Sequence, residues 1–232
     1  MEDRGLAALG ERVVACQRCP RLVSYREAVA RAKRRSFREQ SYWGRPVPGF
    51  GDPRARLLIV GLAPAAHGAN RTGRPFTGDG PHGAGDFLLG SLHRAGLANQ
   101  PFSHDREDGL ELHGAYLTAV VRCAPPGNRP TREEVAACLP YLVEELGILT
   151  EVRAILALGR IAFDGCGRAL RALGAEGRLP RFAHGASSAP GAGLPTLVAS
   201  YHPSRQNTQT GRLTVAMFDR ALARALSPPA PP

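Results

Sequence analysis

Four short apolar segments constrain the fold more than any other feature of this sequence. They are too short for helices, and the stretches between them carry apolar residues at helical spacing, so we interpret the short segments as buried strands. The predicted strands are 56–61, 115–122, 153–159 and 194–200, and the predicted helices are 6–15, 22–35, 82–97, 131–149, 160–173 and 210–226. Strands that alternate with helices predict an α/β fold with a mostly parallel sheet covered on both faces.

Length and composition indicate a single globular unit. A chain of 232 residues with 43% hydrophobic content can bury one sizeable core, so we expect one domain over 1–226 and a disordered tail over 227–232. No apolar run approaches the roughly 20 residues of a membrane helix. The N-terminus begins with charged residues and has no signal-peptide pattern. We therefore expect a cytoplasmic monomer with no membrane partner.

The charge balance favours a polyanionic partner. Thirty Lys and Arg against twenty Asp and Glu give a net charge of +10, and cations that neutralise phosphates release condensed counterions. The densest basic run is RAKRRSFR, from Arg31 to Arg38. Such a run is typical of a nucleic-acid-binding surface and equally of a solvated helix face. Charge alone leaves both interpretations open.

Three polar loops rich in glycine and proline follow the predicted strands, at 61–79, 123–130 and 201–207. In an open α/β sheet the ligand site lies beyond the carboxyl ends of the strands. We therefore expect these three loops to converge on one ligand-binding site.

Four of the five cysteines form two groups. Cys16 and Cys19 lie between the first two predicted helices, whereas Cys123 follows a strand and Cys138 lies within a helix. Four thiolates suit either zinc or a cubane iron-sulfur cluster, and their spacing does not separate the two. Stable disulfides are disfavoured in a cytosolic protein. Cys166 has no partner in this scheme and is interpreted as a small helix residue.

Several motifs at the strand ends carry a family resemblance. The segments GLAPA (61–65), GRPFTGD (73–79), PPGNRP (125–130) and HPS (202–204) resemble the uracil-DNA glycosylase superfamily, specifically its family 5. The resemblance covers nearly the whole chain. It implies a three-layer αβα sandwich around a four-stranded, mostly parallel sheet, and action on deaminated bases in DNA. It also implies a [4Fe-4S] cluster on Cys16, Cys19, Cys123 and Cys138, with about residues 1–55 as an N-terminal iron-sulfur-binding segment of the single domain.

The chemistry of base removal assigns roles to residues in these motifs. Cleavage of an N-glycosidic bond passes through a cationic sugar and an anionic leaving base. A carboxylate can orient the attacking water while a donor stabilises the base. Asp79 and His202 form that pair, with Asn128 as an assistant. The residues expected to contact the flipped base are Gly61, Leu62, Ala63, Phe76 and Ala119.

Two departures from the uracil-specific relatives predict relaxed specificity. Those relatives place Asp, Glu or Gln directly after the first motif glycine, where this chain has Leu62, and an asparagine where this chain has Ala119. An apolar pocket discriminates weakly, whereas a hydrogen-bonding pocket rejects the wrong group strongly. We therefore expect hypoxanthine and xanthine as substrates beside uracil.

The last motif leads into a loop that the resemblance places in the DNA minor groove, with contacts from Ser204, Arg205, Gln206 and Asn207. Taken singly, each of these residues is also common in ordinary surface connections. The alternative function is a non-catalytic nucleic-acid-binding protein whose four cysteines hold structural zinc. An iron-sulfur electron carrier is a third hypothesis, but it explains neither the three polar loops nor the basic excess.

Overall fold

The computed structural model describes residues 2–176 and 179–227, and its centre is a six-stranded sheet in the order β1-β3-β2-β4-β6-β5. The four inner strands are parallel, namely β2 (Leu57–Gly61), β3 (Ala115–Ala119), β4 (Ala154–Leu158) and β6 (Thr196–Ser200). The predicted four-stranded parallel sheet is confirmed. The edge strands β1 (Phe50–Gly51) and β5 (Ser187–Ser188) add antiparallel pairs. Strands of two residues have no periodicity from which to predict them.

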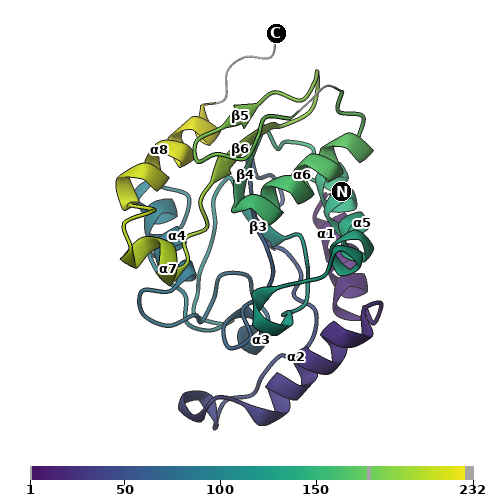
Figure 1. The fold of residues 1–232 in the computed structure, drawn as a ribbon, viewed down its shortest axis with the longest axis vertical. Coiled ribbons are helices and arrows are strands. Elements are labelled where there is room, and N and C mark those ends of the chain that lie inside the picture. Colours follow the sequence, from purple (N-terminus) through teal and green to yellow (C-terminus); the bar gives the residue numbers. More distant parts are fainter. Residues whose placement is uncertain (1, 177–178, 228–232) are drawn as a thin grey trace.

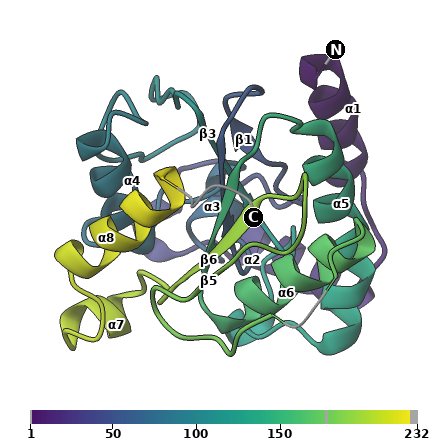
Figure 2. The same ribbon diagram turned by 90° about the horizontal axis from the view of Figure 1, so that it is seen from above.

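Helices cover both faces of the sheet, which confirms the three-layer arrangement (Figures 1 and 2). One face packs against α1 (Glu2–Val14), α5 (Arg132–Ile148) and α6 (Arg160–Ala172). The other packs against α4 (Ala84–Arg94) and α8 (Val215–Leu226). The inner strands are buried at nearly every position, as expected for strands of a sheet whose two faces are both covered by helices.

Local signals fix several helix ends. Thr131 caps α5 in a reciprocal capping box, in which its hydroxyl accepts from the Glu134 N–H at 3.2 Å and the Glu134 carboxylate accepts from the Thr131 N–H at 2.8 Å. Helix α2 (Pro20–Ala32) begins with a proline in its first turn and ends three residues before the predicted Arg35. Lys33 then takes a left-handed φ of 52°, which stops the helix. The predicted tail, apart from Ser227, lies outside the described residues.

The carboxyl ends of the parallel strands open into the loops predicted to form the site, and these loops contain short helices that the sequence did not predict. They are α3 (Ala69–Thr72), η2 (Pro126–Asn128) and α7 (Arg205–Gln209), and another short helix, η1 (Arg35–Phe37), follows α2 outside these loops. Elements of three to five residues are too short for apolar periodicity to reveal. Within residues 2–176 and 179–227, no helix is both long and apolar enough to span a bilayer.

Candidate active site and four-cysteine cavity

A cavity of about 670 Å³ lies at the carboxyl ends of the parallel strands. The strand register places Gly61 of β2 beside Ala119 of β3 at its floor. Ten of the predicted site residues line this cavity, drawn from all three polar loops: Gly61, Leu62, Ala63, Phe76, Asp79, Ala119, Asn128, His202, Ser204 and Arg205. Gln206 and Asn207 follow in α7 without lining it. The predicted convergence of the loops is confirmed.

Asp79 is the acidic residue of the cavity. Desolvation raises the pKa of Asp79 to about 6, outweighing a hydrogen bond from the Gly85 backbone that lowers it. A Cβ added to Gly68 would lie 1.8 Å from the Asp79 Oδ1 atom. The chain can therefore bring this carboxylate against the backbone only because residue 68 is glycine. Asp79 is ionised above about pH 6 and is held in one position.

His202 contributes a neutral ring to the same cavity. Burial lowers the pKa of His202 to about 4, so the imidazole carries no charge at neutral pH. The backbone carbonyl of His202 accepts a hydrogen bond of 2.8 Å from the Asn207 side chain. The Ser204 side chain caps α7 by accepting from the Asn207 N–H at 3.4 Å. The segment after β6 is therefore a fixed turn into a helix, where the sequence suggested a loop.

Phe76 has a strained backbone, with a φ of 53°. Such a conformation costs an aromatic residue on the order of 1 to 3 kcal/mol and is typical of functional sites. Its ring lies over Gly61, where an added Cβ would be 2.8 Å from the Phe76 Cζ atom. The strain therefore holds an aromatic ring at the floor of the cavity.

Two buried arginines, to which the sequence assigned no role, hold the loop that carries Asp79. Arg71 donates from Nη2 to the Gly78 carbonyl at 2.9 Å. Arg74 donates to Thr77 Oγ1 at 3.1 Å and forms an ion pair with Asp108. These bonds join residues 73–79 to the segment around 103–108. Arg74 lies within the GRPFTGD motif, and this position was its only signal in the sequence, whereas Arg71 precedes the motif. Each guanidinium has several N–H donors and can therefore bind several carbonyls at once.

The cavity has one wall that sequence reasoning did not assign. Tyr25, Arg34, Phe37 and His67 line it beside the predicted residues. His67, read from the sequence as structural or solvated, is hydrogen-bonded through Nδ1 to the Tyr42 hydroxyl at 3.1 Å. Arg34 and Phe37 belong to the basic run, whose last residues leave the helix and turn toward the cavity. The run is therefore more than a solvated helix face.

The four predicted cysteine ligands line a second, smaller cavity between α2 and α5. Cys16 and Cys19 are partly exposed, Cys123 and Cys138 are buried, and Cys166 lies elsewhere in the core. Burial raises the pKa of the Cys138 thiol to about 12 and that of Cys123 above its usual range. No group of three or more His, Cys, Asp or Glu side chains in residues 2–176 and 179–227 already has the arrangement of a metal site. The sequence brings four thiols to one cavity from distant positions.

The donors around these thiols suit a negatively charged centre. The Arg26 guanidinium donates from Nη1 to Cys123 Sγ at 3.0 Å, and the Arg122 backbone N–H lies 3.3 Å from Cys138 Sγ. Arg26 is only 1% exposed, and its nearest carboxylate, on the half-exposed Glu27, is 3.9 Å away. A buried cation requires an anionic partner. Thiolates bound to a metal centre would provide one.

Comparison with known proteins identifies the family. A model described as the uracil DNA glycosylase superfamily matches residues 48–226. The chain belongs to this superfamily.

Within the superfamily it is similar to proteins named type-5 uracil-DNA glycosylase. The protein from Thermus thermophilus is 54% identical over 218 residues, covering 94% of this chain and 95% of its own. The Mycobacterium bovis protein is 54% identical over 92% of this chain and 78% of its own. The Pyrobaculum aerophilum protein is 49% identical over 92% and 89%. The resemblance found in the strand-end motifs is confirmed.

Proposed function

We propose that this protein is a uracil-DNA glycosylase that flips deaminated bases out of DNA and hydrolyses their N-glycosidic bond, which begins base-excision repair. One observation carries the proposal. Asp79 and His202, 123 positions apart in the sequence, line one cavity, one as an acid with a pKa of about 6 and the other as a neutral ring. These are the two groups that glycosidic cleavage requires at opposite ends of the breaking bond.

The proposed reaction balances with the groups present. The bond between the sugar C1′ and the base nitrogen breaks, and its electron pair stays on the base as the sugar becomes cationic. Water adds to C1′ and its proton passes to the Asp79 carboxylate, with Asn128 helping to hold the water. The His202 N–H stabilises the anionic base, and Phe76 stacks on it. Because the pKa of His202 is about 4, its neutral ring can donate this hydrogen bond at neutral pH without first being protonated.

The substrates proposed are uracil, hypoxanthine and xanthine. Among the described residues that line the cavity, Asn128 alone carries a carboxamide, and it lies on an exposed turn. At the floor, Leu62, Ala63 and Ala119 offer no side-chain hydrogen bond to a base edge. Backbone amides read a carbonyl oxygen without reading the rest of the ring, so a purine with the same oxygen is accepted.

We also propose that Cys16, Cys19, Cys123 and Cys138 hold a [4Fe-4S] cluster. The buried Arg26 cation and the N–H donors to Cys123 and Cys138 support an anionic centre of four thiolates. Bound there, a cluster would link the N-terminal helices to the sheet domain, so its chemistry is structural. We propose further that the protein is a monomer and acts in the cytoplasm.

The deciding experiment measures release of free base. Single-turnover reactions on oligonucleotides that contain uracil, hypoxanthine or xanthine are expected to release all three, and undamaged DNA none. The iron content of anaerobically purified protein is measured in the same preparation. Binding of damaged DNA without release, together with zinc in place of iron, would instead establish the non-catalytic binding module.

A further inference from the structure

The segment that follows α2 borders the base cavity. Helix α2 ends at Ala32, and the chain then turns through Lys33 into η1. Arg34 and Phe37 line the cavity together with the residues of the proposed active site. In Figure 1 the end of α2 and the turn that follows form the lower tip of the molecule. We call residues 33–38 the basic rim.

The basic rim is fixed to the walls of the cavity. The Phe37 ring packs 4.2 Å from the Arg71 guanidinium carbon, and Arg71 donates to Gly78, next to Asp79. The Arg34 backbone N–H donates to the Tyr42 hydroxyl at 3.3 Å, and that hydroxyl is bonded to His67. The rim therefore keeps a constant position relative to the proposed catalytic carboxylate.

The charges of the rim are not neutralised within the protein. Arg34, Arg35 and Arg38 are exposed, and none forms an ion pair with any residue in 2–176 or 179–227. The Lys33 ammonium donates to the Arg38 carbonyl, which is a neutral acceptor and does not neutralise the positive charge of Lys33. Glu39, also exposed, is the one acidic residue that adjoins the rim in sequence. Four cations against one acid thus face the solvent here.

The opposite side of the mouth differs. Arg205 also lines the cavity, but its Nη2 donates to the carbonyls of Pro81 at 3.0 Å and Asp79 at 3.5 Å. That guanidinium is engaged in holding the loop of Asp79. The Arg34 side chain forms no hydrogen bond or ion pair with any described residue, so this cation is available to a ligand.

We propose that the basic rim binds the backbone of the DNA strand that carries the damaged nucleotide, with Arg34 donating to the phosphate beside the flipped sugar. This inference rests on the proposed function. When a base occupies the cavity, its own sugar and phosphates must lie at the mouth, where Arg34 is. The contact is therefore to the damaged strand itself, and it forms equally with single-stranded and duplex DNA.

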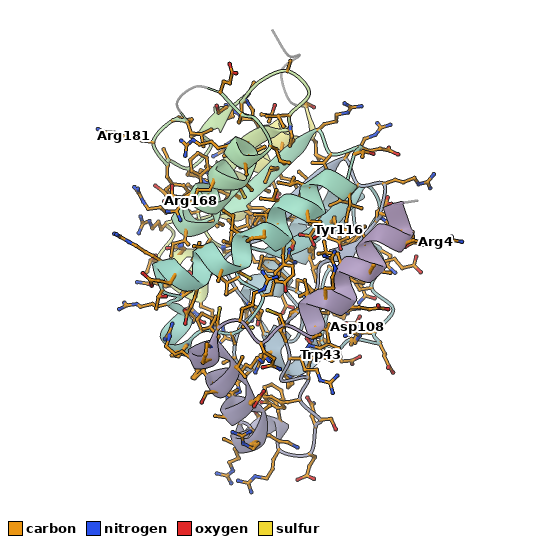
Figure 3. The ribbon with its side chains drawn as sticks, turned by 90° about the vertical axis from the view of Figure 1, so that its right-hand side faces the viewer. Arg4, Trp43, Asp108, Tyr116, Arg168 and Arg181 are labelled. Carbon is orange, nitrogen blue, oxygen red and sulfur yellow. The ribbon has the colours of Figure 1, made fainter. Side chains whose placement is uncertain are left out.

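The test compares Arg34→Ala with Arg168→Ala. Arg168 is an exposed arginine of α6 whose side chain forms no hydrogen bond or ion pair with any described residue, and it lies on the flank of the molecule above the tip (Figure 3). The affinity for an abasic-site analogue is measured in single-stranded and duplex DNA across a range of salt concentrations. We expect Arg34→Ala to raise the Kd roughly tenfold on both DNAs and to reduce the slope of log Kd against log salt by about one. Arg168→Ala should leave both unchanged.

Arg34→Lys provides the control for the charge and should retain most of the affinity. Single-turnover base release is measured at enzyme concentrations above the Kd of each variant, so that a change in the rate of cleavage is separated from the change in affinity. A loss of affinity confined to duplex DNA would overturn the assignment to the damaged strand, and an unchanged salt slope would overturn the phosphate contact. Both quantities are binding measurements, so they stand apart from any failure of the parental protein to release base.

Discussion

The two cavities differ in the partners that the protein provides for the charge of a nearby buried arginine. Near the base cavity, Arg74 pairs with Asp108 and bonds to Thr77 and Ser103, so the cation is neutralised by the protein itself. Beside the cysteines, Arg26 is as deeply buried, yet it contacts a thiol and neutral oxygens. Its nearest carboxylate is that of Glu27 at 3.9 Å, and its Nε has no partner among the described residues. The first site is complete in the polypeptide. In the second, the proposed anionic metal centre would supply the missing partner.

The largest expected effect tests whether the catalytic groups of the base cavity come from the polypeptide alone. Asp79→Asn should slow single-turnover base release about 100- to 10,000-fold, since it removes the proposed proton acceptor. DNA affinity should stay close to the parental value, because the change leaves the phosphate contacts in place. In the parental protein, release should increase as the pH rises through about 6, where Asp79 ionises. A parental rate in the variant would move the role to another group.

The same substitution should stabilise the protein. Burial raises the pKa of Asp79 above its unfolded value, so the folded state holds the proton more tightly. Stability from this group is therefore present below about pH 4 and is lost as the pH rises through about 6. The free energy of unfolding of Asp79→Asn should exceed the parental value by about 3 kcal/mol at pH 8 and should match it near pH 4. Denaturant titrations at the two pH values measure this difference.

Removal of the neutral donor should have the next largest effect. His202→Ala is expected to cost roughly 3 to 4 kcal/mol of transition-state stabilisation, a several-hundred-fold slower release. Since burial lowers the pKa of His202 to about 4, the parental rate should show no second ionisation between pH 6 and 8. A bell-shaped profile over that range would contradict a neutral histidine.

A glycine substitution can disturb the carboxylate without removing it. Gly68→Ala places a Cβ 1.8 Å from Asp79 Oδ1 and should displace the side chain, slowing release about 100-fold. Gly147→Ala is the matched control, because nothing lies within 4 Å of the added Cβ there. If Gly68→Ala cleaves at the parental rate, the position of the carboxylate is not critical.

The contrast between the cavities predicts a different outcome at the cysteines. Cys138→Ser should abolish stoichiometric iron and lower the free energy of unfolding by about 3 to 5 kcal/mol, since loss of the proposed cluster leaves buried Arg26 with only the Glu27 carboxylate 3.9 Å away. Release measured well below the unfolding transition should fall less than about tenfold, because the base cavity is complete in the polypeptide. Cys166→Ser should retain iron, as that thiol lies away from the cavity. Equal iron in both variants would reject the proposed ligand set.

The smallest effect concerns selectivity. Ala119→Asn introduces a carboxamide at the floor of the cavity, beside Gly61, and should favour uracil over hypoxanthine by roughly tenfold. The ratio of the two single-turnover rates is the measurement. An unchanged ratio would show that residue 119 does not face the base edge.

The sequence was sufficient to predict the parallel sheet, because its strands are continuous apolar runs, and to predict the site, because polar loops follow those runs. It did not reveal the buttressing by Arg71 and Arg74, since burial of an arginine depends on carbonyls that folding brings together from distant segments. The role of Arg34 in the cavity wall was also hidden. The position of Arg34 depends on where α2 ends. The helix ends at a lysine with a positive φ, a conformation that glycine usually adopts, so the sequence does not mark this helix end.

The close contact between Phe76 and Gly61 has a consequence for engineering new substrate preferences. The ring lies so near the backbone of residue 61 that any side chain there would displace it. Libraries aimed at reshaping the cavity should therefore leave Gly61 and Phe76 untouched and diversify Ala63 and Ala119, which also line the cavity. We therefore expect larger side chains at the two alanines to change the substrate preference more readily than any substitution of Gly61, where the Phe76 ring contacts the backbone.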